Sequence, residues 1–256
     1  MKTVTLCIAA LLLTCSLSAR AADKREQGYT IGANVDAHGH VTATQLDPDV
    51  SAPIAAILAT AVKQWQFVPA KLDGRPVPAH TFVRAKLQAV ADAKGQYSVR
   101  IRFLGNGPRL DNKSRQPHYP QDAIRAREAA FTILEATAQP DGSLTDMVVS
   151  SKFEAWPLPR SFKLAVLEAA RQWHVEPEQV DGQPVATHMR IPVNFNLNPP
   201  QFTMQEIKIL REAARKETAA ADAEASQPGI PLPSDEEVAL DSPLHPSAVA
   251  TITNAP

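Results

Sequence analysis

The histidines are the residues of this 256-residue chain that are best suited to bind a metal or take part in catalysis. His38 and His40 flank a glycine, and His80 and His188 stand at matching places in two similar segments. A zinc site needs three or four converging ligands, often including a carboxylate. The spacing gathers no such set, and the matching places of His80 and His188 favour a shared loop structure over two metal sites. We therefore predict no metal site and rank a metal-dependent hydrolase last among the functions.

Other chemistries lack their usual residues. No Ser–His–Asp order or pair of suitably spaced carboxylates stands out. Among 10 glycines there is no GxGxxG or GxxxxGK[ST] loop to bind phosphates. A net charge of −1 argues against general nucleic-acid binding. The sequence predicts a protein that is not an enzyme, with no cofactor and no nucleic-acid partner.

The first 21 residues are typical of a secretory signal peptide. Lys2 supplies the positive start, residues 6–13 are all apolar, and Ala19-Arg20-Ala21 fits the cleavage pattern. Both cysteines, Cys7 and Cys15, fall in this segment, so the exported chain has no disulfide or thiol nucleophile. We predict cleavage before residue 22, since a membrane-spanning helix needs about 20 apolar residues. The alternative is a retained membrane anchor.

An internal repeat organises most of the chain. Residues 61–87 align without a gap to residues 169–195, with nine identities in 27 positions at an offset of 108. The shared pattern is QWxxxPxxxDGxPVxxH, which includes the rare tryptophan and two prolines. Duplication of one module explains it better than chance. We predict structural roles, as core anchors and turn residues, for Trp65, Pro69, Gly74, Trp173, Pro177 and Gly182.

Both copies carry the same predicted elements. Apolar residues at helical spacing over 54–65 and 162–173 predict a helix that ends at the tryptophan. Alternating patterns predict strands at 29–35, 41–46 and 83–89 in the first copy and at 131–138, 144–149 and 189–197 in the second. We therefore predict an α+β fold of two tandem small modules, each a helix packed on a three- to four-stranded antiparallel sheet.

The two copies differ at their last strands. Residues 97–104 alternate and are expected to form a hairpin with the strand before them, covering the edge of the first sheet. Pro192 removes a backbone donor from the last strand of the second copy, which predicts an edge strand. The predicted division is a signal peptide (1–21), module 1 (22–104), a linker (105–116), module 2 (117–198), a helix (199–225) and a disordered, acidic, Pro-rich tail (226–256).

Four motifs of the second copy follow a known order. They are YPxxA at 119–123, DG at 141–142, WxxxP at 173–177 and DGxPV at 181–185. In this order they resemble the TonB C-terminal domain family, the periplasmic module of the energy transducer that drives outer-membrane receptors. Three positions depart from the family's pattern: Ala130 replaces a glycine, Val175 an aromatic residue and Glu178 a small one. The resemblance implies the cell envelope of a Gram-negative bacterium, with the chain in the periplasm.

The resemblance also implies the function and partners. We expect a binding protein that engages an extended segment of an envelope or outer-membrane transport protein by strand addition. The alternatives are an energy transducer anchored in the inner membrane and facing the periplasm, and a purely structural protein of tandem modules. Expected partners in transport are a TonB-dependent receptor or an ExbB–ExbD-type complex. The modules could also pair with each other, within one chain or in a homodimer.

By resemblance, the candidate binding surface is the last strand of the second copy with the nearby YP pair. In strand addition, backbone hydrogen bonds give affinity and alternate side chains give specificity. Pro192 leaves two interpretations open: it weakens this edge as a binding site, or it protects an exposed edge from unwanted pairing. The candidate binding residues are Tyr119, Pro120, Arg190, Ile191, Val193 and Phe195.

Overall fold

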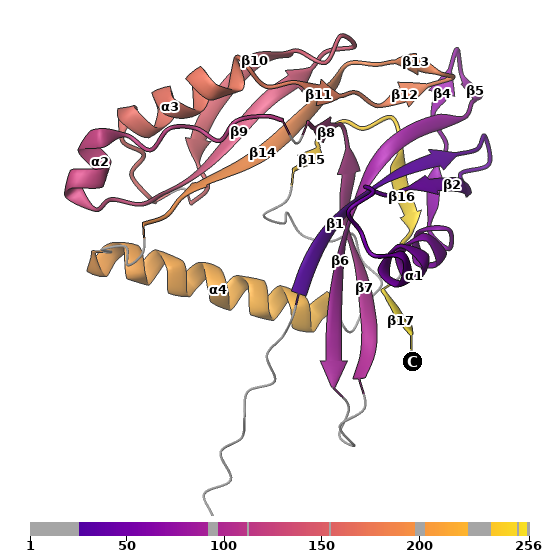
Figure 1. The fold of residues 1–256 in the computed structure, drawn as a ribbon, viewed down its shortest axis with the longest axis horizontal. Coiled ribbons are helices and arrows are strands. Elements are labelled where there is room, and N and C mark those ends of the chain that lie inside the picture. The colour runs from indigo at the N-terminus through magenta and orange to yellow at the C-terminus, as the bar shows by residue number, and fades with distance from the viewer. Residues whose placement is uncertain are drawn as a thin grey trace, which may run out of the picture.

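The computed structural model describes residues 26–91, 97–111, 113–153, 155–197, 203–224, 237–249 and 251–254. These residues form two sheet-and-helix units that lie side by side, one from each half of the chain (Figure 1). The long helix α4 (Met204–Glu224) follows the second unit and lies below it in that view. No helix among the described residues is long and apolar enough to cross a membrane. The predicted signal peptide lies outside the described residues.

The first unit is an antiparallel sheet with one helix packed on it. Its long strands lie in the order β2–β1–β6–β7. They are β1 (Glu26–Val35), β2 (Val41–Gln45), β6 (Ala79–Ala91) and β7 (Tyr97–Gly107). Helix α1 (Ala52–Val62) has a proline in its first turn, where the missing N–H costs little. The helix buries Leu58 and Val62 in a core that also contains Trp65.

The second unit has the same layers. Its sheet order is β10–β9–β14–β15. The long strands are β9 (Ala130–Ala138), β10 (Leu144–Ser151) and β14 (Thr187–Phe195), and the short helix α2 (Gln121–Ala126) precedes them. Helix α3 (Arg160–Ala170) buries Phe162, Val166 and Ala170 against this sheet. Trp173, just after α3, belongs to the same core.

In both units a small hairpin leads into the long strand that follows the helix, β6 in the first unit and β14 in the second. The elements of the first return are β3 (Gln66–Val68), β4 (Lys71–Leu72) and β5 (Arg75–Pro76); those of the second are β11 (Val175–Glu176), β12 (Gln179–Val180) and β13 (Gln183–Pro184). Each hairpin turns at an Asp-Gly pair with φ of 51° and 77° in the first and 51° and 75° in the second. Positive φ at both central positions is the turn geometry that Asp-Gly favours.

The two units keep a constant spacing of elements along the chain. α1 and α3 begin 108 residues apart, and the same offset separates β4 from β12, β5 from β13 and β6 from β14. This is the offset of the sequence repeat. The mixed fold, with antiparallel sheets and few helices, confirms the predicted α+β class.

The prediction of a disordered tail is wrong for residues 237–249 and 251–254. This segment forms β15 (Val238–Ala239), β16 (His245–Ala248) and β17 (Ile252–Asn254), which pair with β14, β3 and β7. Its acidic residues and prolines suggested disorder, but Leu244 is buried in the core of the first unit with 1% exposure. Partners distant in sequence, including Arg84 for Glu237, hold the acidic residues in place.

The predicted linker is also partly wrong. Strand β7 continues to Gly107, and β8 (Arg109–Leu110) follows at once and pairs with β11 of the second unit. The polar residues and glycines of residues 105–116 had predicted a linker that packs against neither unit. In the structure, the glycines lie where β15 approaches β7 closely, and Arg109 pairs with Asp47 and Glu176.

Candidate functional site

Strand β14 separates its residues onto two faces. Thr187, Met189 and the three predicted binding residues Ile191, Val193 and Phe195 point into the core, and those three are 4%, 6% and 4% exposed. Arg190 and Asn194 lie on the opposite face, which is less buried. The candidate contact surface is therefore the Arg190 side of the strand and the part of its backbone edge that no described strand covers.

Tyr119 and Pro120 close one end of the second core. The ring of Tyr119 lies edge-on to Phe162 and Phe195, with centroids 5.7 and 5.5 Å away, and its hydroxyl donates to the carbonyl of Glu128. Pro120 is the residue that precedes α2. Because Phe195 and Tyr119 are in contact, the structure brings these predicted residues together as a packing cluster.

The outer edge of β14, away from β9, is partly covered. The carbonyl of His188 accepts a hydrogen bond from the N–H of Leu240 at 2.8 Å, and the N–H of His188 donates to Oδ1 of Asp241 at 2.6 Å. The pairing between β14 and β15 is Met189 with Ala239 and Arg190 with Val238. The prediction that β14 is an edge strand is therefore wrong along its first half, since the returning C-terminal segment covers it.

Pro192 belongs to the part of this edge that lies beyond β15. Backbone groups of alternate residues in a strand point to the same side. Since His188 faces outward, Arg190, Pro192 and Asn194 do so too. The donor missing at Pro192 therefore faces away from β9, and the described pairing with β15 stops at Arg190.

The same edge of the first unit is filled by a complete strand. The sheet orders β2–β1–β6–β7 and β10–β9–β14–β15 correspond, so β15 stands where β7 stands in the first unit. Strand β7 pairs with β6 from Phe82 to Ala91, whereas β15 pairs with β14 only at Met189 and Arg190. Among the described residues, the outer edge of β14 is thus only half occupied by another strand.

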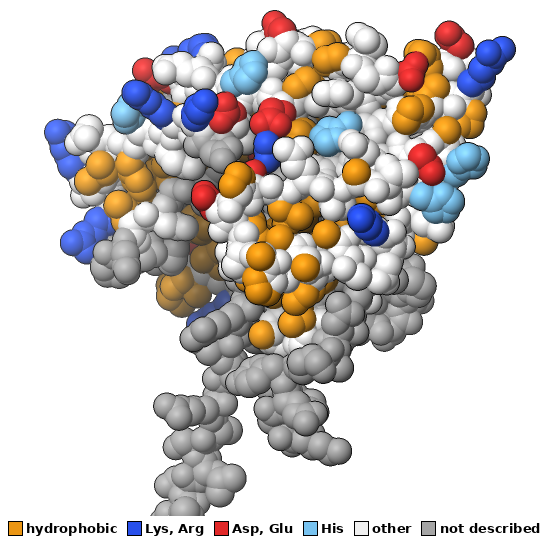
Figure 2. Space-filling view, turned by 45° about the vertical axis from the view of Figure 1, so that its right-hand side comes forward, with side chains coloured by type: hydrophobic (Ala, Val, Ile, Leu, Met, Phe, Trp, Pro, Cys, Tyr) orange, Lys and Arg blue, Asp and Glu red, His pale blue; other side chains and the backbone are white. Residues whose placement is uncertain are grey.

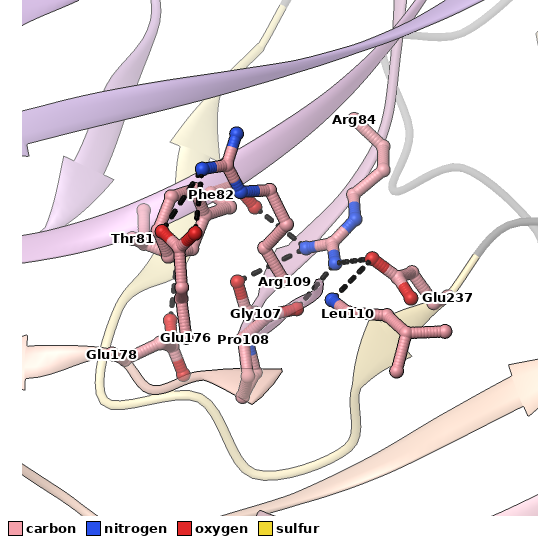
Figure 3. Close-up of polar contacts among 10 residues, drawn as sticks. All are labelled: Thr81, Phe82, Arg84, Gly107, Pro108, Arg109, Leu110, Glu176, Glu178 and Glu237. Carbon is pink, nitrogen blue, oxygen red and sulfur yellow. Dashed lines mark hydrogen bonds and ion pairs between the residues drawn. The ribbon is translucent and has the colours of Figure 1, made fainter. Parts of the chain in front are cut away.

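A buried arginine connects the first unit to the C-terminal segment (Figure 3). Arg84, 1% exposed, donates to the carbonyls of Phe82 at 2.8 Å and Gly107 at 3.0 Å, and to that of Pro108. Its Nη2 also lies 2.6 Å from Oε1 of Glu237. A buried cation needs such partners to offset its lost hydration.

A buried carboxylate joins both units and the C-terminal segment. Glu178 accepts hydrogen bonds from the hydroxyls of Thr81 at 2.5 Å, Ser242 at 2.7 Å and Thr187 at 3.1 Å. Burial raises the pKa of Glu178 above its usual value, although these hydroxyls act against the rise. Asn106 of β7 extends the network by donating to Ser242 and the carbonyl of Leu244.

A polar cavity of about 640 Å³ opens beside this junction. Arg109 lies at its wall, bound to Asp47 at 2.8 Å and to both oxygens of Glu176 at 2.8 and 3.0 Å. Its guanidinium also lies 4.9 Å from the centre of the Phe82 ring. Among the described lining residues, the carboxylates of Asp47 and Glu176 therefore share the one guanidinium of Arg109.

The histidines singled out from the sequence serve turns and strands. The N–H groups of His38 and His40 donate to Oδ1 of Asp36 at 2.8 and 2.9 Å, and these bonds, that of His40 first, lower the pKa of Asp36. Nδ1 of His80 lies 2.6 Å from Oδ1 of Asn34, and burial lowers the pKa of His80. Within the described ranges, no three His, Cys, Asp or Glu side chains group as a metal site would require.

The face drawn in Figure 2 has basic and acidic side chains interspersed, with an apolar area between them in its lower middle. That face therefore lacks the broad positive surface with which proteins bind phosphate backbones.

Sequence reasoning assigned no role to Arg84, Glu178, Glu237 or Leu244. Glu178 had one visible signal, because it departs from the family's small residue and occupies the place of Ala70 in the repeat. Ala70 is buried in the first core, so a carboxylate at the equivalent position needed buried hydrogen-bond donors. Thr187 lies only nine residues away, but Thr81 and Ser242 come from distant segments that the sequence could not bring together.

Comparison with known proteins places the second unit in a family. Residues 115–197 match the model of the Gram-negative bacterial TonB protein C-terminal. The protein named "Protein TonB" in two strains of Xanthomonas campestris pv. campestris is 35% identical over 82 residues, which cover 32% of this chain and 35% of the relative. The chain therefore spans about a third of the length of these relatives, and the first unit lies outside the match.

Proposed function

We propose that this chain, whose residues 115–197 form a TonB C-terminal domain, is a periplasmic protein that binds an extended segment of an outer-membrane transport protein by strand addition. Its partners are TonB-dependent receptors, with an ExbB–ExbD-type complex as a further partner if the N-terminus is retained as an anchor. The proposal treats the two units as tandem copies of one module. Their common element spacing supports this.

The observation that carries the proposal is the half-occupied edge of β14. Strand β7, at the matching edge of the first unit, pairs antiparallel with β6 and supports the proposal that the second sheet takes up a further strand in the same way. Beyond Arg190 the outer edge of β14 offers the carbonyl of Pro192 and both backbone groups of Asn194. The side chains of Arg190 and Asn194 lie on the less buried face, where they are placed to select a partner's residues.

A structural role for the first unit is favoured by a separate observation. Its own sheet edge is covered by β7, and β7 in turn pairs with β17 at Val99–Ile101. The Glu178 network then fixes the first unit to the second. We propose that the first unit is a scaffold that positions the binding unit, so both roles coexist in one chain.

The test is to remove one outward N–H from the edge. Asn194→Pro deletes this donor while leaving the side of β14 that pairs with β9 intact, and Asn194→Ala keeps the donor and is the control. Binding is measured by fluorescence anisotropy against peptides from the periplasmic N-terminal segments of the source bacterium's outer-membrane receptors. Leaving a buried backbone acceptor unpaired costs about 1–3 kcal/mol, roughly 5- to 150-fold in affinity.

We expect Asn194→Pro to weaken peptide binding by that factor and Asn194→Ala to change it little. Circular dichroism of both variants verifies the fold. If a folded Asn194→Pro protein binds as tightly as the control, the edge of β14 is not the binding site. The intact mass of the protein from its native envelope separates the anchored and cleaved forms.

A further inference from the structure

We propose that residues 237–241 are a built-in occupant of the first half of the strand-accepting edge of β14, and that a partner segment can pair along the whole edge only by displacing them. The inference rests on the proposed function, because both concern the same edge. It adds a competitor within the chain and specifies the chemistry that a partner segment must present.

The occupant lies in a slot between the two units. On one side β15 pairs with β14, and on the other it approaches the end of β7. A Cβ added at Gly107 would lie 2.6 Å from the backbone nitrogen of Ala239, and one at Gly105 would lie 2.4 Å from Cγ1 of Val238. The two glycines, with φ of 149° and 156°, leave the room that a strand needs here.

Acidic groups hold both ends of this segment. Glu237 binds the buried Arg84 at 2.6 Å and accepts the N–H of Leu110 at 3.1 Å. Four residues later, Asp241 accepts the N–H of His188. Charge-assisted bonds of this kind are stronger than those between neutral groups. They give the slot a specific requirement for a carboxylate.

The occupant is nevertheless lightly held between these ends. Its pairing with β14 covers two residues of the strand, and the side chain of Leu240 is 49% exposed. The next part of the chain is held firmly, with Leu244 in the first core and β16 paired to β3. Residues 237–241 can therefore leave the edge while remaining tethered beside it, where a high effective concentration favours their return.

A segment that displaces residues 237–241 must replace the contacts that these residues make with Arg84 and with the two glycines of β7. Departure of Glu237 leaves the guanidinium of Arg84 without its carboxylate, so a competitor with an acidic residue at this place is favoured. The two following residues lie against Gly105 and Gly107, which restricts them to small side chains. We infer that the partner segment is extended and carries an acidic residue followed by two small apolar residues.

The first test releases the occupant without touching β14. Leu240→Pro removes the N–H that donates to His188, and Leu240→Ala keeps it and is the matched control at an exposed position. Hydrogen exchange of the His188 and Arg190 amides is measured by NMR in the full protein. We expect both amides to exchange at least tenfold faster in Leu240→Pro than in the control. Equal exchange in the two variants would overturn the proposal.

The second test asks whether a free peptide binds to the edge of β14 once residues 237–241 have been released from it. The probe is a synthetic peptide of residues 235–243, DEEVALDSP, added at millimolar concentration to the Leu240→Pro protein. We expect the peptide to slow exchange at both amides at least threefold, and its Glu237→Gln version to have a weaker effect. If neither peptide slows exchange, the edge does not accept a free segment and the proposal fails.

Two further measurements keep the result unambiguous. If Leu240→Pro does not fold, Asp241→Ala takes its place with the Arg190 amide as the readout, because the His188 amide loses its own acceptor in this variant. Receptor peptides are titrated separately against the Leu240 variants. If they bind neither protein although the exchange rates differ, the proposed function is rejected and self-occupancy stands. If they bind Leu240→Pro more tightly than Leu240→Ala, displacement of the occupant limits binding.

Discussion

Leu244 provides a sharp test of whether the C-terminal segment belongs to the folded core. Leu244→Ala removes three carbons from a side chain that is 1% exposed. At about 0.8 kcal/mol per buried carbon, the loss of transfer free energy is roughly 2.4 kcal/mol. The cavity left behind adds to this, and measured Leu-to-Ala costs in cores span about 2–5 kcal/mol. We therefore expect the free energy of unfolding to fall by about 3 kcal/mol.

The same segment supplies the control for this substitution. Leu240 is 49% exposed, so Leu240→Ala should change the free energy of unfolding by no more than about 0.5 kcal/mol. Both variants are compared with the parent protein by urea denaturation, followed by circular dichroism and tryptophan emission. Trp65 reports directly because it lies in the same core cluster as Leu244. A loss below about 1 kcal/mol for Leu244→Ala would refute the packing of this segment in the core.

Two further predictions concern the second unit. Burial raises the folded-state pKa of Glu178 above its unfolded value, so the native state binds this proton more tightly than the unfolded state does. The protonated side chain therefore contributes to stability at low pH. This contribution is lost as the pH rises from about 4.5 through the raised pKa. Glu178→Gln should flatten this dependence in urea titrations between pH 4 and about 8, and parallel curves for the two proteins would contradict the assignment. Trp173→Phe loses the bond from its indole nitrogen to the carbonyl of Arg115, at 2.7 Å, and part of a buried ring. We expect a loss of about 1–3 kcal/mol in urea denaturation, and a change under about 0.5 kcal/mol would show that this bond is unimportant.

Local patterns were enough for the main elements of both units. The apolar spacing at 54–65 and 162–173 predicted helices, and α1 and α3 cover most of these ranges. The Asp-Gly pairs predicted turns because few residue types adopt positive φ at low cost. The family resemblance rested on such locally determined residues, and the match at residues 115–197 confirms it for the second copy.

The candidate site was predicted less well, for a reason visible in β14. Its alternation marked Ile191, Val193 and Phe195 as a common face but did not say whether that face met a partner or the helix α3. The structure places them in the core, and what remains for recognition is backbone. A backbone edge has no sequence signature except the absence of a donor, as at Pro192.

The sequence by itself determined the class of fold, the repeat and the turns, because these depend on residues that are neighbours along the chain. Only the tertiary structure decided the place of the C-terminal segment. Its acidic residues and prolines predict disorder, and its three strands pair with β14, β3 and β7 rather than with one another. The charge of Arg84 holds Glu237, and the absence of a side chain at Gly107 leaves room for Ala239. The backbone of His188, on the outer edge of β14, holds Leu240. Such complementarity exists only after the two units have folded and met.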